Sequence, residues 1–174
     1  SSPTSAGALL RLLREEVAVT RADLARETGL ARSTVAQRVD ALLGQGLVYE
    51  AGGSPSTGGR PATVLAFNRD AGVVLVADLG ATHARVAVSD LVGTPLAERA
   101  DDLDIGLGPD QALAWVAECF ADLLDEVGRS AGDVRGIGVG VPGPVEFDSG
   151  RPVNPPIMPG WDDFPIPEWF ADLY

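Results

Sequence analysis

The sequence contains no lysine and only one cysteine, one histidine and one methionine among its 174 residues. The single cysteine, Cys119, excludes an internal disulfide framework and any cysteine-rich zinc motif, and we expect it to be a small core residue. The one histidine, His83, cannot build a zinc site alone. No apolar run approaches the ~18 residues that a membrane span requires, and no segment has the pattern of a secretory leader. We therefore expect a cytoplasmic protein without a membrane partner or a metal site in this chain.

Charge is distributed unevenly along the chain, whose formal net charge is −12. Residues 1–69 contain eight arginines and six acidic side chains, whereas residues 70–174 contain five arginines and nineteen acidic side chains. The first part can approach the phosphate backbone of DNA, and the second part is repelled by it. This asymmetry indicates two domains with different tasks, which we place at residues 1–68 and 70–174.

The first domain has the pattern of three short helices. The first is predicted over residues 6–16, and the second follows Thr20, a good N-cap, and ends at Gly29, which suits a left-handed C-terminal cap. The third is predicted over residues 32–45 and stops at Gly46. A short helix, a glycine-containing turn and a longer helix together predict a helix-turn-helix.

Polar side chains lie opposite the apolar stripe of the third predicted helix. They are near its N-terminus, the part that enters the major groove in this motif. Glutamine and arginine can form paired hydrogen bonds with purine edges, and serine and threonine can reach bases or phosphates. An ordinary solvated helix face has the same composition and remains the alternative. The candidate DNA-reading residues are Ser33, Thr34, Gln37 and Arg38, with Arg32 assigned to the DNA backbone.

Two short strands are predicted after the helices, at residues 47–51 and 62–67. The loop between them reads Gly-Gly-Ser-Pro-Ser-Thr-Gly-Gly-Arg-Pro, which is long for a hairpin. Interpreted as a wing, it presents Arg60 to a narrow minor groove. The alternative is a glycine- and serine-rich loop with an incidental arginine.

The second domain alternates strand and helix patterns in the order β-β-β-α-β, which predicts a mixed α/β sheet. Its first strand is a nearly continuous apolar run, which is typical of a strand buried on both faces. The proline-rich tail is predicted to be loop-like, with a helix starting at Ile166. The strands are predicted at residues 73–79, 84–89, 95–103 and 134–141, and the helix at residues 109–129.

The turn after the first of these strands carries Asp78, Gly80 and Thr82. An Asp-x-Gly-x-Thr turn offers backbone N–H groups and a hydroxyl to a phosphate, and its carboxylate can hold hydrated Mg²⁺. A tight turn that simply requires Gly80 explains the pattern equally well.

Three stretches of the chain carry a family resemblance. The first is the predicted winged helix-turn-helix ending in Gly-Arg-Pro at 59–61, and the second is Asp-Leu-Gly-Ala-Thr-His-Ala-Arg-Val at 78–86. The third is Gly-Ile-Gly-Val-Gly-Val-Pro-Gly-Pro-Val at 136–145, followed by Asn-Pro-Pro at 154–156 and Pro-Gly-Trp at 159–161. Together they resemble the ROK family of repressors, open reading frames and kinases. The resemblance implies a mixed α+β and α/β chain, in which a winged helix-turn-helix precedes the first lobe of an actin-like (ribonuclease H-like) ATPase fold, and it implies that the intact protein is longer.

The turn at Asp78 departs from the pattern of ROK kinases, which bind ATP phosphates with Asp-x-Gly-Gly-Thr-Lys. Here Ala81 replaces the second glycine and His83 replaces the lysine. A Cβ atom at position 81 hinders close approach of a phosphate, and both changes favour a repressor over a kinase. We therefore interpret Asp78, Gly80 and Thr82 as a vestigial nucleotide-phosphate site and assign no catalytic residue to this chain.

The leading hypothesis is a DNA-binding transcriptional regulator of the repressor type, controlled by a sugar or sugar-phosphate effector. The resemblance implies a double-stranded DNA operator as partner and a homo-oligomer, a dimer or tetramer, in the intact protein. It assigns no cofactor to this chain and places any zinc site in the C-terminal part beyond it. One alternative is a ROK-type sugar kinase that carries a DNA-binding head and phosphorylates a hexose with ATP. Another is a winged-helix module used for protein contacts.

Overall fold

The computed structural model describes residues 5–53 and 63–174, so Arg60 lies outside the described residues. The chain divides into two compact units, Ser1–Ala71 and Gly72–Tyr174, here called the head and the body. Each has its own hydrophobic core. The two units are therefore described separately.

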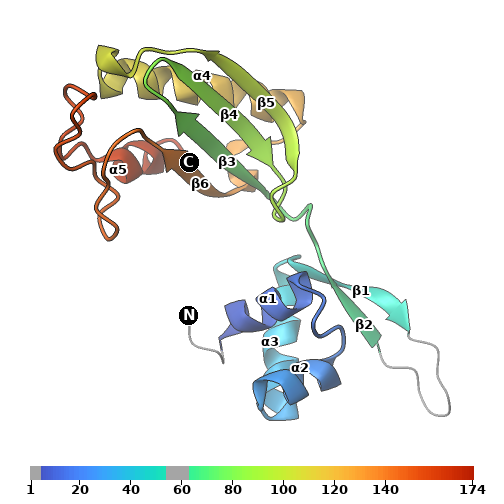
Figure 1. Cartoon of the computed structure of the whole chain (residues 1–174). Coiled ribbons are helices and arrows are strands. Elements are labelled where there is room, and N and C mark those ends of the chain that lie inside the picture. Colours follow the sequence, from blue (N-terminus) through green and yellow to red (C-terminus); the bar gives the residue numbers. More distant parts are fainter. Residues whose placement is uncertain (1–4, 54–62) are drawn as a thin grey trace. The chain divides into compact units, whose positions relative to one another are not determined.

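Three helices and a two-stranded antiparallel sheet form the head (Figure 1). Their apolar faces meet in one core, in which Leu9, Leu24, Val35 and Val39 have no exposed surface. The prediction of three helices followed by two strands is confirmed. The elements are α1 (Ala6–Arg14), α2 (Arg21–Thr28), α3 (Arg32–Gly44), β1 (Val48–Gly53) and β2 (Thr63–Phe67).

Local capping groups set the bounds of the head helices. The Thr20 side chain accepts a hydrogen bond from the Asp23 N–H at 3.1 Å and so begins α2. Gly29 ends α2 in a left-handed conformation with φ of 68°. Ala31, which has no side-chain acceptor, precedes α3 without a side-chain cap. Helix α1 ends two residues earlier than predicted, and Glu16 then takes a positive φ of 55°.

A four-stranded sheet forms the body, in the order β5-β4-β3-β6 (Figure 1). The pairs β3/β4 and β4/β5 are antiparallel, and β3/β6 is parallel, because α4 carries the chain back to the start of β6. The predicted order β-β-β-α-β is confirmed. The elements are β3 (Val73–Leu79), β4 (His83–Ser89), β5 (Pro95–Asp102), the short 3₁₀ turn η1 (Ile105–Leu107), α4 (Pro109–Glu126), the 3₁₀ turn η2 (Ala131–Asp133), β6 (Val134–Gly140) and α5 (Ile166–Ala171).

The prediction of a buried strand holds for one face of β3 and not for the other. Its burial alternates: Leu75 and Ala77 are buried, whereas Val76 is 39% exposed and Asp78 is exposed. The buried side chains share one core with α4 and α5. Helices α4 and α5 both contribute to that core. The apolar run of β3 is therefore covered mainly on the face that carries Leu75 and Ala77.

The core of the body contains Cys119, the one cysteine of the sequence. Cys119 is 3% exposed on α4, and this burial raises the pKa of its thiol, as expected for a small core residue rather than a reactive one. Trp161 is fully buried, and its indole Nε1 donates to the Ile105 carbonyl at 3.2 Å. In the described ranges, no group of three or more His, Cys, Asp or Glu could hold a metal ion, and no helix is long and apolar enough to cross a membrane.

Candidate DNA interface

The open face of α3 is the candidate DNA interface of the head. Side chains on a helix rotate by about 100° per residue, so Ser33 and Gln37 lie on one side and Val35 and Val39 on the other. Both valines have no exposed surface, whereas Ser33 and Gln37 are exposed. Burial of the valine stripe therefore fixes which polar side chains α3 presents to solvent.

The five residues predicted to contact DNA from α3 differ in their exposure. Arg32, Ser33 and Gln37 are exposed, whereas Thr34 and Arg38 are half-buried. Arg32, at the first position of α3, projects on a different flank from Arg38 by helix geometry. The structure thus brings Ser33 and Gln37 together at the centre of the open face and places the two arginines towards its sides.

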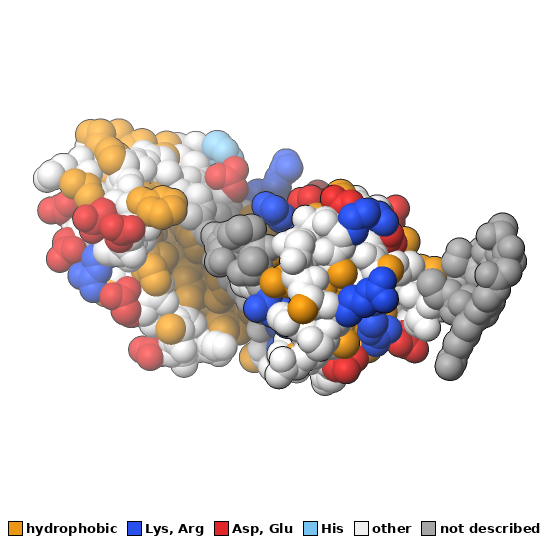
Figure 2. Space-filling view, turned by 90° about the horizontal axis from the view of Figure 1, so that it is seen from below, with side chains coloured by type: hydrophobic (Ala, Val, Ile, Leu, Met, Phe, Trp, Pro, Cys, Tyr) orange, Lys and Arg blue, Asp and Glu red, His pale blue; other side chains and the backbone are white. Residues whose placement is uncertain are grey.

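The arginines of the head differ in their ion pairing. Arg26 pairs with Asp23 at 2.8 Å and with Glu27 at 3.4 Å. The Thr20 hydroxyl and then Arg26 lower the pKa of Asp23, so this charge pair is satisfied within α2. In the described ranges, neither Arg32 nor Arg38 has an acidic partner. Figure 2 shows several arginine side chains on one face of the head, with hydrophobic and other uncharged groups between them.

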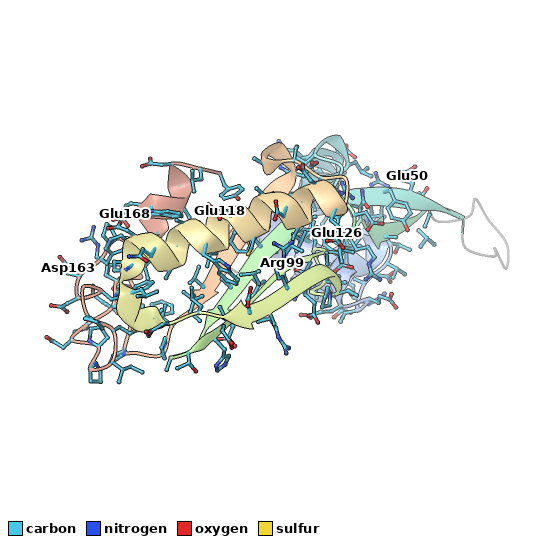
Figure 3. All side chains as sticks on the ribbon, turned by 90° about the horizontal axis from the view of Figure 1, so that it is seen from above. Glu50, Arg99, Glu118, Glu126, Asp163 and Glu168 are labelled. Atoms are coloured by element: carbon cyan, nitrogen blue, oxygen red, sulfur yellow. The ribbon has the colours of Figure 1, made fainter. Side chains whose placement is uncertain are left out.

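Sequence patterns did not reveal an ion-pair cluster centred on Arg21. Its guanidinium binds Asp40 of α3 at 3.2 Å and Glu50 of β1 at 3.3 Å, and Figure 3 labels Glu50 on that strand. The cluster joins α2, α3 and the first wing strand. It also neutralises Asp40, which would otherwise place a negative charge near the DNA-facing side of α3. No local signal could have found it, because the three residues come from three elements.

Hydrogen bonds to backbone carbonyls fix the base of the wing. The Leu65 N–H donates to the Val19 carbonyl at 2.7 Å, which ties β2 to the residue before Thr20, the N-cap of α2. The Asn68 side chain donates to the Gly46 carbonyl at 2.9 Å, just after α3. The two wing strands are thus anchored to both ends of the helix-turn-helix. The predicted wing contact, Arg60, lies in the range 54–62, outside the described residues.

In the body, Asp78, Gly80 and Thr82 meet in the β3–β4 turn, as their spacing requires. The Gly80 N–H donates to the His83 carbonyl at 2.8 Å, so this expected phosphate donor is already used. The His83 imidazole covers Gly80: a Cβ atom there would lie 2.6 Å from the ring. Asp78 is exposed, and its Oδ1 would lie 3.2 Å from a Cβ atom on Gly140 of the neighbouring strand. A larger residue at position 80 would therefore displace the His83 side chain.

Comparison with known proteins gives matches to both units. Residues 6–49 match the family model described as winged helix-turn-helix DNA-binding. The xylose repressor of Caldicellulosiruptor bescii is 27% identical over 158 residues, which cover 91% of this chain and 39% of that protein. The xylose repressor of Bacillus subtilis strain 168 is 27% identical over 166 residues, which cover 95% of this chain and 42% of that protein. The chain thus spans about two fifths of the length of these curated relatives.

A solved structure supports the fold along nearly the whole chain. The crystal structure of a ROK family transcriptional regulator, described as a homologue of the Escherichia coli Mlc protein, superimposes with a TM-score of 0.75. The match covers 95% of this chain and 42% of the other, at 22% identity. It confirms the predicted combination of a winged helix-turn-helix with a mixed α/β lobe.

Proposed function

We propose that this chain is the operator-binding head and first lobe of a sugar-responsive transcriptional repressor of the ROK family. One observation carries the proposal: the described winged helix-turn-helix exposes Ser33 and Gln37 on α3, beside two arginines that lack acidic partners. An arginine without an acidic partner is free to neutralise a phosphate and release its counterions.

In the proposed interface, different side chains of the head contact different parts of the DNA. Ser33, Thr34, Gln37 and Arg38 face the major groove, where base edges carry a distinct donor and acceptor pattern. Arg32 contacts the DNA backbone, which positions the head without reading sequence. Arg60, on the wing loop, enters the adjacent minor groove. The acidic body, repelled by phosphate, stays clear of the duplex.

The proposed effector is a sugar or sugar-phosphate bound by the intact protein, which acts as a homo-oligomer in the cytoplasm. The relatives named xylose repressors make D-xylose the first sugar to test. Such control requires the effector to bind the DNA-competent and the incompetent states with different affinity. Two heads on one dimer would then bind matching half-sites, whose spacing reflects the two-fold symmetry. Any zinc site is proposed to lie in the remainder of the intact protein.

The sugar kinase remains the second candidate because the β3–β4 turn keeps Asp78, Gly80 and Thr82. We favour the repressor because the Gly80 N–H is occupied by His83 and its surface is covered by the imidazole. A kinase needs such donors for the phosphates of ATP. ATP-dependent phosphorylation of a hexose by the full-length gene product would overturn this preference.

A mobility-shift titration tests the proposed function. The full-length gene product is titrated against the DNA upstream of its own gene, with and without D-xylose or another single sugar. We expect a discrete shifted complex that at least one sugar weakens. If the folded protein shifts no upstream fragment, the proposal fails. If no sugar weakens the complex, the proposed operator binding holds and the proposed sugar effector is wrong.

A further inference from the structure

The amide of Gln37 lies free at the centre of the open face of α3. Gln37 is the sixth residue of the helix and is exposed. In the described ranges, no hydrogen bond engages its side chain. Its neighbours one turn away along the helix are Ser33, Thr34, Asp40 and Ala41. None of these side chains is longer than that of Gln37, so the amide can reach a base edge past them. Gln37 can therefore meet a base pair without rearrangement, which lowers the cost of binding.

Arg38, the other residue suited to a purine, is arranged differently. It is half-buried, and its Nη1 atom is covered and has no hydrogen-bond partner among the described residues. An end-on bidentate contact with guanine uses both Nη1 and Nη2 of the guanidinium. Arg38 must shift to expose Nη1 for that contact, whereas the Gln37 amide is already exposed.

Asp40 is the only acidic side chain of α3, and it is also engaged. A free carboxylate on this face would accept a hydrogen bond from the cytosine amino group. The Asp40 Oδ1 instead lies 3.2 Å from the Arg21 guanidinium. Beside the Ser33 hydroxyl, the centre of this face thus presents a neutral amide to a base.

We infer that Gln37 is a specificity-determining residue and that it selects adenine in the operator half-site, an inference that rests on the proposed DNA-binding function. The Gln37 amide oxygen accepts from adenine N6, and its N–H group donates to adenine N7. Guanine presents two acceptors, O6 and N7, so the amide oxygen would face an acceptor there. The amide is thus complementary to adenine and mismatched with guanine.

Selection from random DNA tests this inference. The 174-residue chain is used to select duplexes from a pool with a randomised core, in parallel with Gln37→Ala, Gln37→Glu and Arg38→Ala. The affinity for the best duplex is then measured by competition against its single-base variants. Circular dichroism spectra show that each variant is folded. Gln37→Glu is the matched variant, because it keeps the shape of the side chain and replaces the amide with an acceptor.

The expected result is an adenine preference at one position that only the Gln37 variants change. Wild type should discriminate against guanine there by about 5- to 150-fold, and 7-deazaadenine should weaken binding because it lacks the N7 acceptor. Gln37→Ala should bring the discrimination near unity, and Gln37→Glu should favour cytosine. Arg38→Ala should keep the adenine preference.

Two results would overturn the inference, and they are distinguishable. If the chain selects DNA with a base preference that Gln37→Ala leaves intact, Gln37 is not the reader and the DNA-binding function stands. If neither the folded chain nor the folded full-length gene product retains any duplex, the proposed function fails, and the adenine assignment fails with it.

Discussion

The arginines on α3 of the head differ from most arginines of the body in their ion pairing. On α3 of the head, Arg32 and Arg38 have no acidic partner in the described ranges, although Arg21 and Arg26 do. In the body, Arg99 binds Asp122 at 2.9 Å. The comparison shows that the basic character of the head depends less on its small charge excess than on which arginines are left unneutralised.

Most arginines of the body form ion pairs with its acidic side chains. Arg151 binds Glu168 at 2.7 Å and Asp163 at 3.3 Å, and Figure 3 labels both acids near the end of the chain. These hydrogen bonds raise the pKa of the Arg151 guanidinium and lower that of Glu168. A paired, strongly acidic unit offers little to DNA, so the difference assigns nucleic-acid binding to the head.

The two cores differ as well. The head closes its core between three helices and two strands. The body leaves Val76 exposed on one face of its sheet, and an apolar groove of about 440 Å³ runs beside β6, lined by Ile137, Val139 and Phe170 among others. Both units leave some large apolar side chains exposed, such as Tyr49 in the head and Val76 in the body. Because each unit has its own core, we expect the two units to unfold separately.

Truncation of Phe120 should give the largest effect and should separate the two cores. Phe120 is fully buried and contacts Phe170, with ring centroids 6.0 Å apart. Phe120→Ala should lower the free energy of unfolding of the body by about 3–5 kcal/mol and leave the head unchanged. Urea unfolding followed by circular dichroism should show one transition moved and one kept. Leu24→Ala, in the head core, should move the other transition; a single transition shifted by both variants would contradict the separation.

Removal of Arg32 should reduce the salt dependence of DNA binding, whereas removal of an arginine from the body should not. A lost phosphate contact reduces the slope of log affinity against log salt by about one, which is about tenfold in affinity for each tenfold change in salt. Fluorescence anisotropy on one duplex at several salt concentrations measures the slope. Arg85→Ala removes an exposed charge from the body and should leave the slope unchanged. Equal effects of the two variants would mean that DNA does not distinguish head from body.

Removal of the α2 cap should destabilise the head alone. Thr20→Ala removes the acceptor for the Asp23 N–H and should cost about 1 kcal/mol in the free energy of unfolding of the head. The Thr20 hydroxyl also lowers the pKa of Asp23 below its ordinary value of 3.8. The stability that this carboxylate contributes is therefore present above pH 3.8 and lost as the pH falls through the lowered pKa.

The pH profile provides the control for that prediction. Urea midpoints of the head measured between pH 3 and 6 should fall at the acid end in wild type and fall less steeply in Thr20→Ala, whose Asp23 has a pKa nearer the ordinary value. Parallel profiles for the two proteins would show that the hydroxyl does not act through Asp23.

Loss of Arg21 should give the smallest change in stability. Its two ion pairs are partly exposed, so Arg21→Ala should lower the free energy of unfolding of the head by about 0.2–1 kcal/mol. DNA affinity should also fall, because Asp40 is left without its counter-charge beside the phosphates. Arg99→Ala breaks a comparable pair in the body and should leave DNA affinity unchanged in the same anisotropy measurement. Unchanged affinity of Arg21→Ala would place Asp40 away from the DNA.

The head was more predictable from sequence than the body. Thr20 and Gly29 act through atoms a few residues away, so their caps follow from local pattern. The stripe of Val35 and Val39 correctly identified the open face of α3. The apolar run of β3 predicted a buried strand, but it did not show that one face stays partly exposed, because that depends on the helices packed there.

The pairing of charges could not be predicted from sequence either, because it depends on how the elements pack. Arg21, Asp40 and Glu50 are brought together by the packing of three elements. The partial covering of Arg38 likewise depends on how the head packs. Helix periodicity placed Gln37 and Arg38 together among the DNA-reading residues, and only the structure distinguishes the free amide from the covered guanidinium.

The most direct test of DNA binding by α3 is fluorescence anisotropy of this chain with DNA from its own promoter at two salt concentrations. We expect salt-sensitive binding that the double variant Arg32→Ala/Gln37→Ala loses and that Arg85→Ala in the body retains. Equally tight binding by wild type and by the folded double variant would contradict the claim that α3 of the head is the DNA-binding surface.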